Sequence, residues 1–369
     1  MTLALHPGSR VPVRVMDPAI ATGTLEVDAD GVATLRAGDP GVSPVATIGP
    51  GWVDLHAHVY DGTTQISVHP DRVGLDHGVH TVLDAGSAGQ ATLPGLLDYV
   101  IPTAQTRVLA WLNIGSHGLV DLRETSDARL IDVDASVAAV LSAPDVVRGV
   151  KVRSSGAIVG NMGLQPLELG KLVARTAGVP LLVHIGEAPP LIDAVLDLLD
   201  TGDSITHCFH GKTGYPWQPD GEPSSALRRA LDRGVRLDVG HGAASFDVAV
   251  AERAIRAGYL PHTISTDIHV RNIGGPVFDL ATVMTKLLHC GMPLTAVIDA
   301  VTRAPRETIG LDEPWLGPNG AINHATLFEV TDAAPSHRRY VDAVGAAIEP
   351  HEHLVALATI SNGVARACV

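Results

Sequence analysis

Hydrophobic and polar positions change their spacing twice along this chain. Near both ends, apolar and polar residues alternate over short stretches, which indicates strands with one buried face. These stretches are residues 11–17, 23–30 and 31–38 and then residues 324–332, 338–350 and 353–363. We therefore expect a small, discontinuous β-domain of residues 1–50 and 320–369 beside a central domain of residues 51–319.

The central stretch contains short apolar runs of the kind expected for strands that are buried on both faces. These candidate strands are residues 51–58, 80–86, 107–115, 147–153, 180–186, 204–210, 235–242 and 262–269. Amphipathic helical patterns lie between several of them, at residues 134–143, 166–178, 191–202, 224–234 and 246–258. Eight strands that alternate with helices favour an α/β fold of the (β/α)8 TIM barrel type over an open doubly wound sheet.

The composition narrows the class of protein. The chain has 369 residues, 46% of them hydrophobic, so a large core can form, and its formal net charge is −14. An acidic chain without a basic run binds nucleic acid and anionic membranes poorly. No apolar stretch is long enough to span a bilayer, and the first residues lack the pattern of a signal peptide. We expect a cytoplasmic protein that acts on a small molecule, without nucleic acid or membrane as a partner. A homo-oligomer is possible, and the sequence does not decide the oligomeric state.

Ligand-type side chains gather at one end of the predicted strands. They are His56 and His58 on the first strand, Lys151 and Arg153 on the fourth, His184 on the fifth, His207 on the sixth, His241 on the seventh and Asp267 on the eighth. The carboxyl ends of barrel strands meet at one face, where barrel active sites lie. His56 and His58 are two residues apart in a strand, so both can point at one ion. A single strand histidine is more often a hydrogen-bonded core residue, but the whole set predicts a metal site.

The motifs around these residues resemble a known family. The segments PGWVDLHAHVYDG, GVKVR, VPLLVHIGEAP, DSITHCFHGK and HTISTDIH are similar to the signature segments of binuclear metal-dependent amidohydrolases. The resemblance is strongest to the amidohydrolase/deacetylase group often labelled dihydroorotase-like, and it covers nearly the whole chain. It implies a barrel that holds two divalent ions. The ligand types suit zinc, with manganese, iron or cobalt as alternatives.

The resemblance also implies a role for each ligand. The first ion would be bound by His56, His58 and Asp267, and the second by His184 and His207. Lys151 would be carboxylated by CO2 and bridge both ions, because an ammonium has no lone pair for a cation whereas a carbamate has two anionic oxygens. The alternatives are an ordinary salt-bridged lysine at position 151 and a purely structural capping role for Asp267.

The activity implied by the resemblance is hydrolysis of an amide or ester bond. A water that bridges the ions would lose its proton to Asp267 and attack a carbonyl, and Asp267 would pass the proton to the leaving group. The group implies removal of an acetyl group from a small N- or O-acetylated acid. A cyclic-amide hydrolase of the dihydroorotase or hydantoinase type and a non-catalytic binding protein stay open. Dihydroorotases usually carry an arginine soon after the paired histidines, and HAHVYDG has none.

Three further residues are candidate substrate contacts. Arg153 lies two residues beyond Lys151, so it can bind a substrate carboxylate or equally pair with an acidic loop residue. His210, in HCFHGK, and His241, between two glycines, are weaker candidates. Either could instead form hydrogen bonds that orient the metal ligands.

Overall fold

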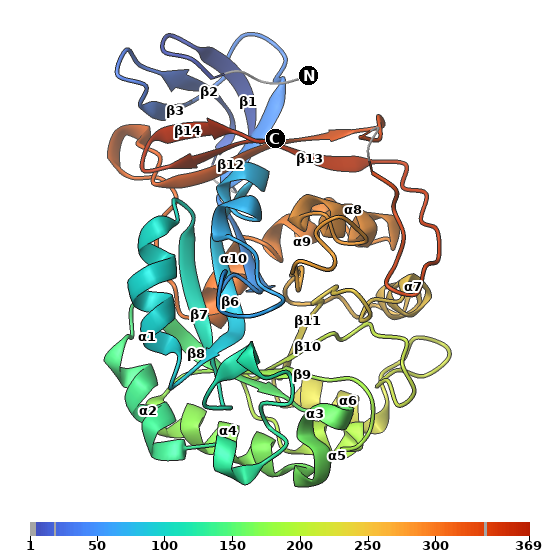
Figure 1. Cartoon of the computed structure of the whole chain (residues 1–369). Coiled ribbons are helices and arrows are strands. Elements are labelled where there is room, and N and C mark those ends of the chain that lie inside the picture. Colours follow the sequence, from blue (N-terminus) through green and yellow to red (C-terminus); the bar gives the residue numbers. More distant parts are fainter. Residues whose placement is uncertain (1–4, 18–19, 336–337) are drawn as a thin grey trace.

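Two seven-stranded sheets organise the protein, whose structure is a computed structural model that describes residues 5–17, 20–335 and 338–369. Figure 1 shows one sheet across the top, where strands from both ends of the chain lie side by side. The other sheet runs through the middle of the molecule, with helices around it. The two sheets are joined directly, because β4 ends at Pro50 and β5 begins at Trp52.

The upper sheet combines residues from both chain ends. In spatial order its strands are β14 (Val364–Ala367), β13 (His353–Ser361), β12 (His324–Thr331), β4 (Ala46–Pro50), β1 (Arg10–Asp17), β2 (Ile20–Val27) and β3 (Ala33–Ala37). Alternate residues of β1 are buried, namely Val11, Val13 and Val15, which explains the alternation in the sequence. The central pair, β4 and β12, is antiparallel and joins residues that are far apart in the chain.

One stretch expected to be a strand is a loop. Residues 338–350 contain a β-bridge between Val341 and Ala347 but no strand. The buried carboxylate of Asp342 accepts hydrogen bonds from the backbone N–H groups of Val344 and Ala346. This side chain folds the backbone back on itself, so the apolar alternation here reflects a packed turn and the prediction of a strand was wrong.

The second sheet is entirely parallel. Its strands are β5 (Trp52–Ala57), β6 (Val79–Gly89), β7 (Arg107–Asn113), β8 (Val147–Arg153), β9 (Leu181–His184), β10 (Ser204–Thr206) and β11 (Arg236–Asp238). They correspond to seven of the eight predicted central strands. The eighth predicted stretch forms bridges in place of a regular strand: Thr263 pairs with Asp238 of β11, and Ile268 pairs with Ala57 of β5. Residues 263–268 therefore join the two edges of the sheet.

Helices surround the parallel sheet (Figure 1). They are α1 (Leu93–Gly95), α2 (Val133–Ser142), α3 (Gly156–Val159), α4 (Gln165–Ala177), α5 (Ile192–Asp197), α6 (Ser225–Asp232), α7 (Val248–Arg256), α8 (Leu280–His289), α9 (Leu294–Asp299) and α10 (Arg303–Thr308). The helical patterns in the sequence correspond to α2, α4, α5, α6 and α7. Helix α4 ends where Gly178 takes a left-handed conformation with φ +70°, a usual way to stop a helix.

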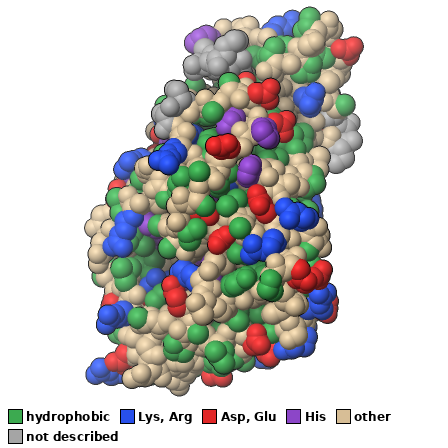
Figure 2. All heavy atoms as spheres, turned by 90° about the vertical axis from the view of Figure 1, so that its right-hand side faces the viewer, with side chains coloured by type: hydrophobic (Ala, Val, Ile, Leu, Met, Phe, Trp, Pro, Cys, Tyr) green, Lys and Arg blue, Asp and Glu red, His purple; other side chains and the backbone are tan. Residues whose placement is uncertain are grey.

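The surface mixes charges of both signs. On the face shown in Figure 2, Lys and Arg side chains are interspersed with Asp and Glu. Among the described helices, none combines the length and the apolar character needed to cross a membrane.

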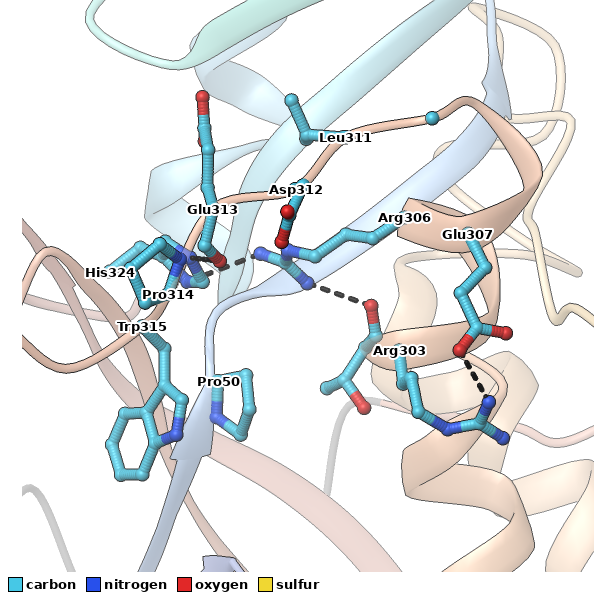
Figure 3. A pocket seen from close by; sticks show the side chains of 12 residues that line it. Pro50, Arg303, Arg306, Glu307, Leu311, Asp312, Glu313, Pro314, Trp315 and His324 are labelled. Atoms are coloured by element: carbon cyan, nitrogen blue, oxygen red, sulfur yellow. Dashed lines mark hydrogen bonds and ion pairs between the residues drawn. The ribbon is translucent and has the colours of Figure 1, made fainter.

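Arg306 of α10 connects the two sheets from a buried position. Its guanidinium donates to the carbonyl oxygens of Thr302 and Gly51, both at 2.8 Å, and lies 3.1 Å from Nδ1 of His324 in β12. Figure 3 shows this arginine in the wall of a cavity of about 460 Å³ beside Pro50.

This cavity is separate from the predicted metal ligands. It lies next to the residue that precedes β5, so it is at the opposite end of that strand from His56 and His58. Its charged lining residues are Arg303, Arg306, Glu307, Asp312 and Glu313. Acids outnumber arginines here, so the lining offers no excess positive charge for an anion.

Arg306→Met tests the connection between the sheets. The substitution leaves two buried carbonyl oxygens without their donor, and we expect the free energy of unfolding to fall by about 2–4 kcal/mol. The measurement is the shift of the urea midpoint at constant slope. Arg303→Met, in the same helix, is the control, because exposed ion pairs such as those of Arg303 contribute less than about 1 kcal/mol. Equal losses in the two variants would contradict this role for Arg306.

Candidate metal centre

The six predicted ligands lie together at the carboxyl ends of the parallel strands. His56 is in β5, His58 follows it, Lys151 is in β8, His184 ends β9, His207 follows β10 and Asp267 is in the closing segment 263–268. Oδ1 of Asp267 lies 3.0 Å from Nε2 of His58 and 3.3 Å from Nε2 of His56. The same nitrogen of His56 lies 3.0 Å from Nζ of Lys151, and Nε2 of His207 lies 2.9 Å from Nδ1 of His184.

His56 and His207 connect the two halves of this group. One ring nitrogen of each and one carboxylate oxygen of Asp267 all lie within 4.8 Å of one another. Imidazole nitrogens and carboxylate oxygens are ligands for zinc and for related divalent ions. The residues present therefore fit a divalent metal ion.

Burial sets the protonation states that a metal requires. Desolvation, helped by the nearby Lys151, holds the pKa of His56 well below its usual value, and desolvation also lowers the pKa of His207 to about 3. Burial alone would raise the pKa of Asp267, but the neighbouring His56 and His58 hold it well below its usual value. Neutral imidazoles and an ionised carboxylate are the forms that bind cations.

Lys151 is fully buried, and its burial favours the neutral amine over the ammonium. Desolvation lowers its pKa to about 7, against the opposing attraction of Asp267. Gly86, with φ +83°, lies directly against the lysine: a Cβ at this position would be 2.9 Å from both Cβ and Cγ of Lys151. A glycine is therefore needed at position 86 for the lysine to reach the centre.

A chain of hydrogen bonds orients His56. The hydroxyl of Thr206 donates to Oδ2 of Asp238 at 2.7 Å and lies 2.9 Å from Nδ1 of His56. Since the hydroxyl proton goes to the aspartate, the hydroxyl oxygen accepts the proton of Nδ1. Nε2 of His56 is then the unprotonated nitrogen, and it faces Lys151 and Asp267. Hydrogen bonds of this kind fix both the tautomer and the orientation of metal-binding histidines.

His207 and His58 are also bonded through Nδ1. Nδ1 of His207 donates to the carbonyl oxygen of Gly240 at 2.6 Å, which leaves Nε2 free as a lone-pair donor. Nδ1 of His58 lies 3.0 Å from the hydroxyl of Ser87. Three imidazoles thus present Nε2 to the centre.

Two of the predicted ligands adopt unusual backbone conformations. His207 has φ +72° and Asp267 has φ +48°, in the left-handed region that non-glycine residues rarely enter. Strained residues of this kind cluster at functional sites, where the surrounding structure imposes the conformation.

The sequence interpretation missed two aspartates, Asp238 and Asp54, whose hydrogen bonds position the predicted ligands or their neighbours. Asp238 accepts hydrogen bonds from Thr206, Thr263 and Ser265, and Asp54 accepts from Thr266. Burial raises the pKa of Asp54 to about 7. An aspartate within an otherwise apolar strand was the available signal, because such a residue needs hydrogen-bond partners.

Arg153 takes the second of its two predicted alternatives. Its guanidinium donates two hydrogen bonds to Glu124, at 2.7 and 2.6 Å, and the glutamate side chain is only 1% exposed. Arg153 is therefore paired with an acidic loop residue, whose position the sequence did not reveal.

The two candidate histidines have different surroundings. Nδ1 of His241 lies 2.8 Å from the carbonyl oxygen of Gly242, to which it donates, and Nε2 accepts from Nζ of the buried Lys286 at 2.9 Å. Neither nitrogen of His241 is left for a substrate. His210 is fully buried, its Nδ1 accepts from the backbone N–H of Lys212 at 3.2 Å, and Nε2 has no partner within the described residues.

Known proteins resemble this chain in sequence and fold. No family model matches the chain. The chain is similar to a deacetylase of Agrobacterium fabrum (strain C58), with 44% identity over 291 residues, 78% of this chain and 72% of that protein. A deacetylase of Enterococcus faecalis (strain V583) is 34% identical over 326 residues, 88% of this chain and 87% of that protein. The chain belongs to this deacetylase family of the amidohydrolase superfamily.

A solved structure supports the same membership. A crystal structure described as a dihydroorotase matches with a TM-score of 0.86 and 35% identity, over 97% of this chain and 98% of that chain. The resemblance predicted from the sequence motifs is confirmed. This amidohydrolase is a hydrolase that acts on carbon–nitrogen bonds.

Thr206→Val tests the orienting hydrogen bonds of this amidohydrolase. Valine has a similar shape but removes the acceptor of His56 and a donor to Asp238, so we expect zinc affinity to fall by about 10- to 100-fold. The measurement is competition with a chelator. Thr308→Val is a matched control, because Thr308 is also buried and bonded, to the carbonyl oxygen of Ala304 in α10. A loss of zinc affinity as large in Thr308→Val would mean that general destabilisation is the cause.

Proposed function

We propose that this amidohydrolase is a deacetylase that hydrolyses the acetyl amide or acetyl ester of a small carboxylic acid. The observation that carries the proposal is the convergence of six ligand-type residues in a chain 44% identical to a protein named a deacetylase. The products are acetate and the free amine or alcohol of the acid.

The architecture behind this proposal is a (β/α)8 barrel. Its support is the all-parallel sheet, whose edges are both bridged by residues 263–268, together with the surrounding helices. We assign residues 51–319 to the barrel and residues 1–50 and 320–369 to the small β-domain.

We assign the metal centre to two divalent ions of the zinc type. His56, His58 and Asp267 would hold the first, and His184 and His207 the second. Lys151 would bridge them as a carbamate, formed when its neutral amine adds to CO2 and releases a proton. The lowered pKa of Lys151 supports this step, because burial favours the neutral amine, which is the form that adds to CO2.

The bound ions supply Lewis acidity and promote ionisation of a water molecule. Asp267 accepts the proton of the attacking water, since its low pKa keeps the carboxylate ionised and its oxygen faces the ligands. Asp267 then returns that proton to the leaving amine or alcohol. Asn272 donates to the carbonyl oxygen of Asp267 at 2.9 Å and so fixes the backbone that carries this carboxylate.

A substrate panel tests the proposed activity. We expect zinc-loaded protein to release acetate from N-acetylated amino acids or O-acetylated hydroxy acids, and to accept only one enantiomer of each. The measurement is acetate release, with dihydroorotate and hydantoin as comparison substrates. The match to a structure described as a dihydroorotase makes ring opening the second candidate. Hydrolysis of the rings alone would contradict the deacetylase assignment.

Lys151→Ala tests the bridging lysine. We expect the variant to lose its activity and part of its bound metal, and short carboxylic acids such as propionate to restore some of both, because they can occupy the place of the carbamate. Lys286→Ala is the matched control, since Lys286 is also buried and desolvation lowers its pKa to about 7. Full activity in Lys151→Ala, or equal rescue of both variants, would remove Lys151 from the centre.

A further inference from the structure

A lysine that the sequence interpretation did not single out lies beside the metal centre. Lys212 is on the loop that follows β10 and the ligand His207, and its Nζ lies 3.0 Å from Oε1 of Glu187. Glu187 follows β9, three residues after the ligand His184. The ion pair therefore joins the loops beyond two of the ligand-bearing strands.

The partner of Lys212 can be displaced. The Glu187 side chain is 58% exposed, against 23% for Lys212, and exposed ion pairs contribute little to stability. The hydroxyl of Ser155 donates to the other carboxylate oxygen of Glu187 at 3.0 Å. A substrate carboxylate could take the place of Glu187 beside Lys212 while Glu187 turns to water.

Arg153 is not available in the same way. Its partner Glu124 is buried and receives two hydrogen bonds from the guanidinium. Displacing Glu124 would leave an uncompensated charge in the interior, which is strongly unfavourable. Of these two cations, Lys212 is the one with an exposed and replaceable partner.

His210 offers a second donor next to Lys212. Its Nδ1 accepts the backbone N–H of Lys212, so the neutral ring carries its proton on Nε2. That nitrogen is buried and has no hydrogen-bond partner among the residues that the structure describes. A buried donor without an acceptor costs free energy, and a carboxylate oxygen is an acceptor that would satisfy it.

We propose that Lys212, assisted by His210, binds the carboxylate of the substrate and that this carboxylate displaces Glu187. The inference rests on the proposed function, because it assigns the acid group of the acetylated acid to a particular cation. It implies selectivity for acids over their neutral amides, since an uncharged amide cannot replace the carboxylate of Glu187 beside the ammonium.

Steady-state kinetics on O-acetyl-lactate and O-acetyl-lactamide test the assignment. We expect Lys212→Met to raise KM for the acid by about tenfold or more, the effect of losing a charged hydrogen bond, and to leave KM for the amide nearly unchanged. Glu187→Gln should lower KM for the acid, because the competing charge is gone. An unchanged KM for the acid in Lys212→Met, an equal rise for acid and amide, or a higher KM for the acid in Glu187→Gln would overturn the proposal.

Lys171→Met is the matched control. Lys171 pairs with Asp200 at 2.7 Å, with side chains 17% and 65% exposed, close to the values for Lys212 and Glu187. Asp200 precedes β10, so this pair lies at the other end of that strand from His207. We expect KM for both substrates to stay at the wild-type value in this variant.

A binding measurement separates this inference from the proposed function. The shift in Tm caused by lactate, compared with lactamide, requires no hydrolysis. If no acetylated acid is hydrolysed, the proposed function fails, yet lactate should still stabilise the wild type more than Lys212→Met. Equal stabilisation of both proteins by lactate would overturn the role of Lys212 whatever the activity.

Discussion

Closure of the parallel sheet by residues 263–268 is the constraint on which the candidate metal centre depends. In strand order, β5 and β11 are at opposite edges of the sheet, and this segment bridges to both. Asp54 holds it against β5 by accepting hydrogen bonds from the backbone N–H and the hydroxyl of Thr266, at 3.1 and 2.5 Å. The next residue, Asp267, is thereby placed within reach of His56 and His58. Without that closure, Asp267 would not lie next to His56 and His58, because the segment that carries it would not be paired with β5.

Three buried aspartates, Asp54, Asp84 and Asp238, lie around the predicted ligands. Burial raises the pKa of Asp54, Asp84 and Asp238, because a carboxylate loses its hydration in the interior. Hydroxyl and backbone N–H donors offset part of this cost, as do Ser87 and Val59 for Asp84. A cation held among the histidines would offset more of it, so the aspartates both orient the ligands and favour positive charge at the centre.

Local sequence patterns predicted most of the strands and the convergence of the ligands. This worked because parallel strands that end at one face impose a shared position on their last residues, whatever the details of packing. The segment at residues 338–350 was misread, since the role of Asp342 depends on a side-chain turn that alternation cannot show. The partners of Arg153 and His241 were also beyond reach, because Glu124 and Lys286 come from other parts of the chain. Hydrophobic periodicity reports local structure and does not show which distant segments come into contact, so these partners are seen only in the folded structure.

The central pairing of the upper sheet has a consequence for how the chain is made. Strand β4 is complete at Pro50, but its partner β12 ends at Thr331. At the usual rate of translation of about 5–20 residues per second, roughly 15 to 60 seconds pass between the synthesis of β4 and the synthesis of β12, and one edge of β4 is unpaired during this time. During this interval an unpaired strand edge is open to wrong pairing. The ribosome therefore sets the earliest moment at which this sheet can close, and chaperones that shield nascent strands have a defined window in which to act.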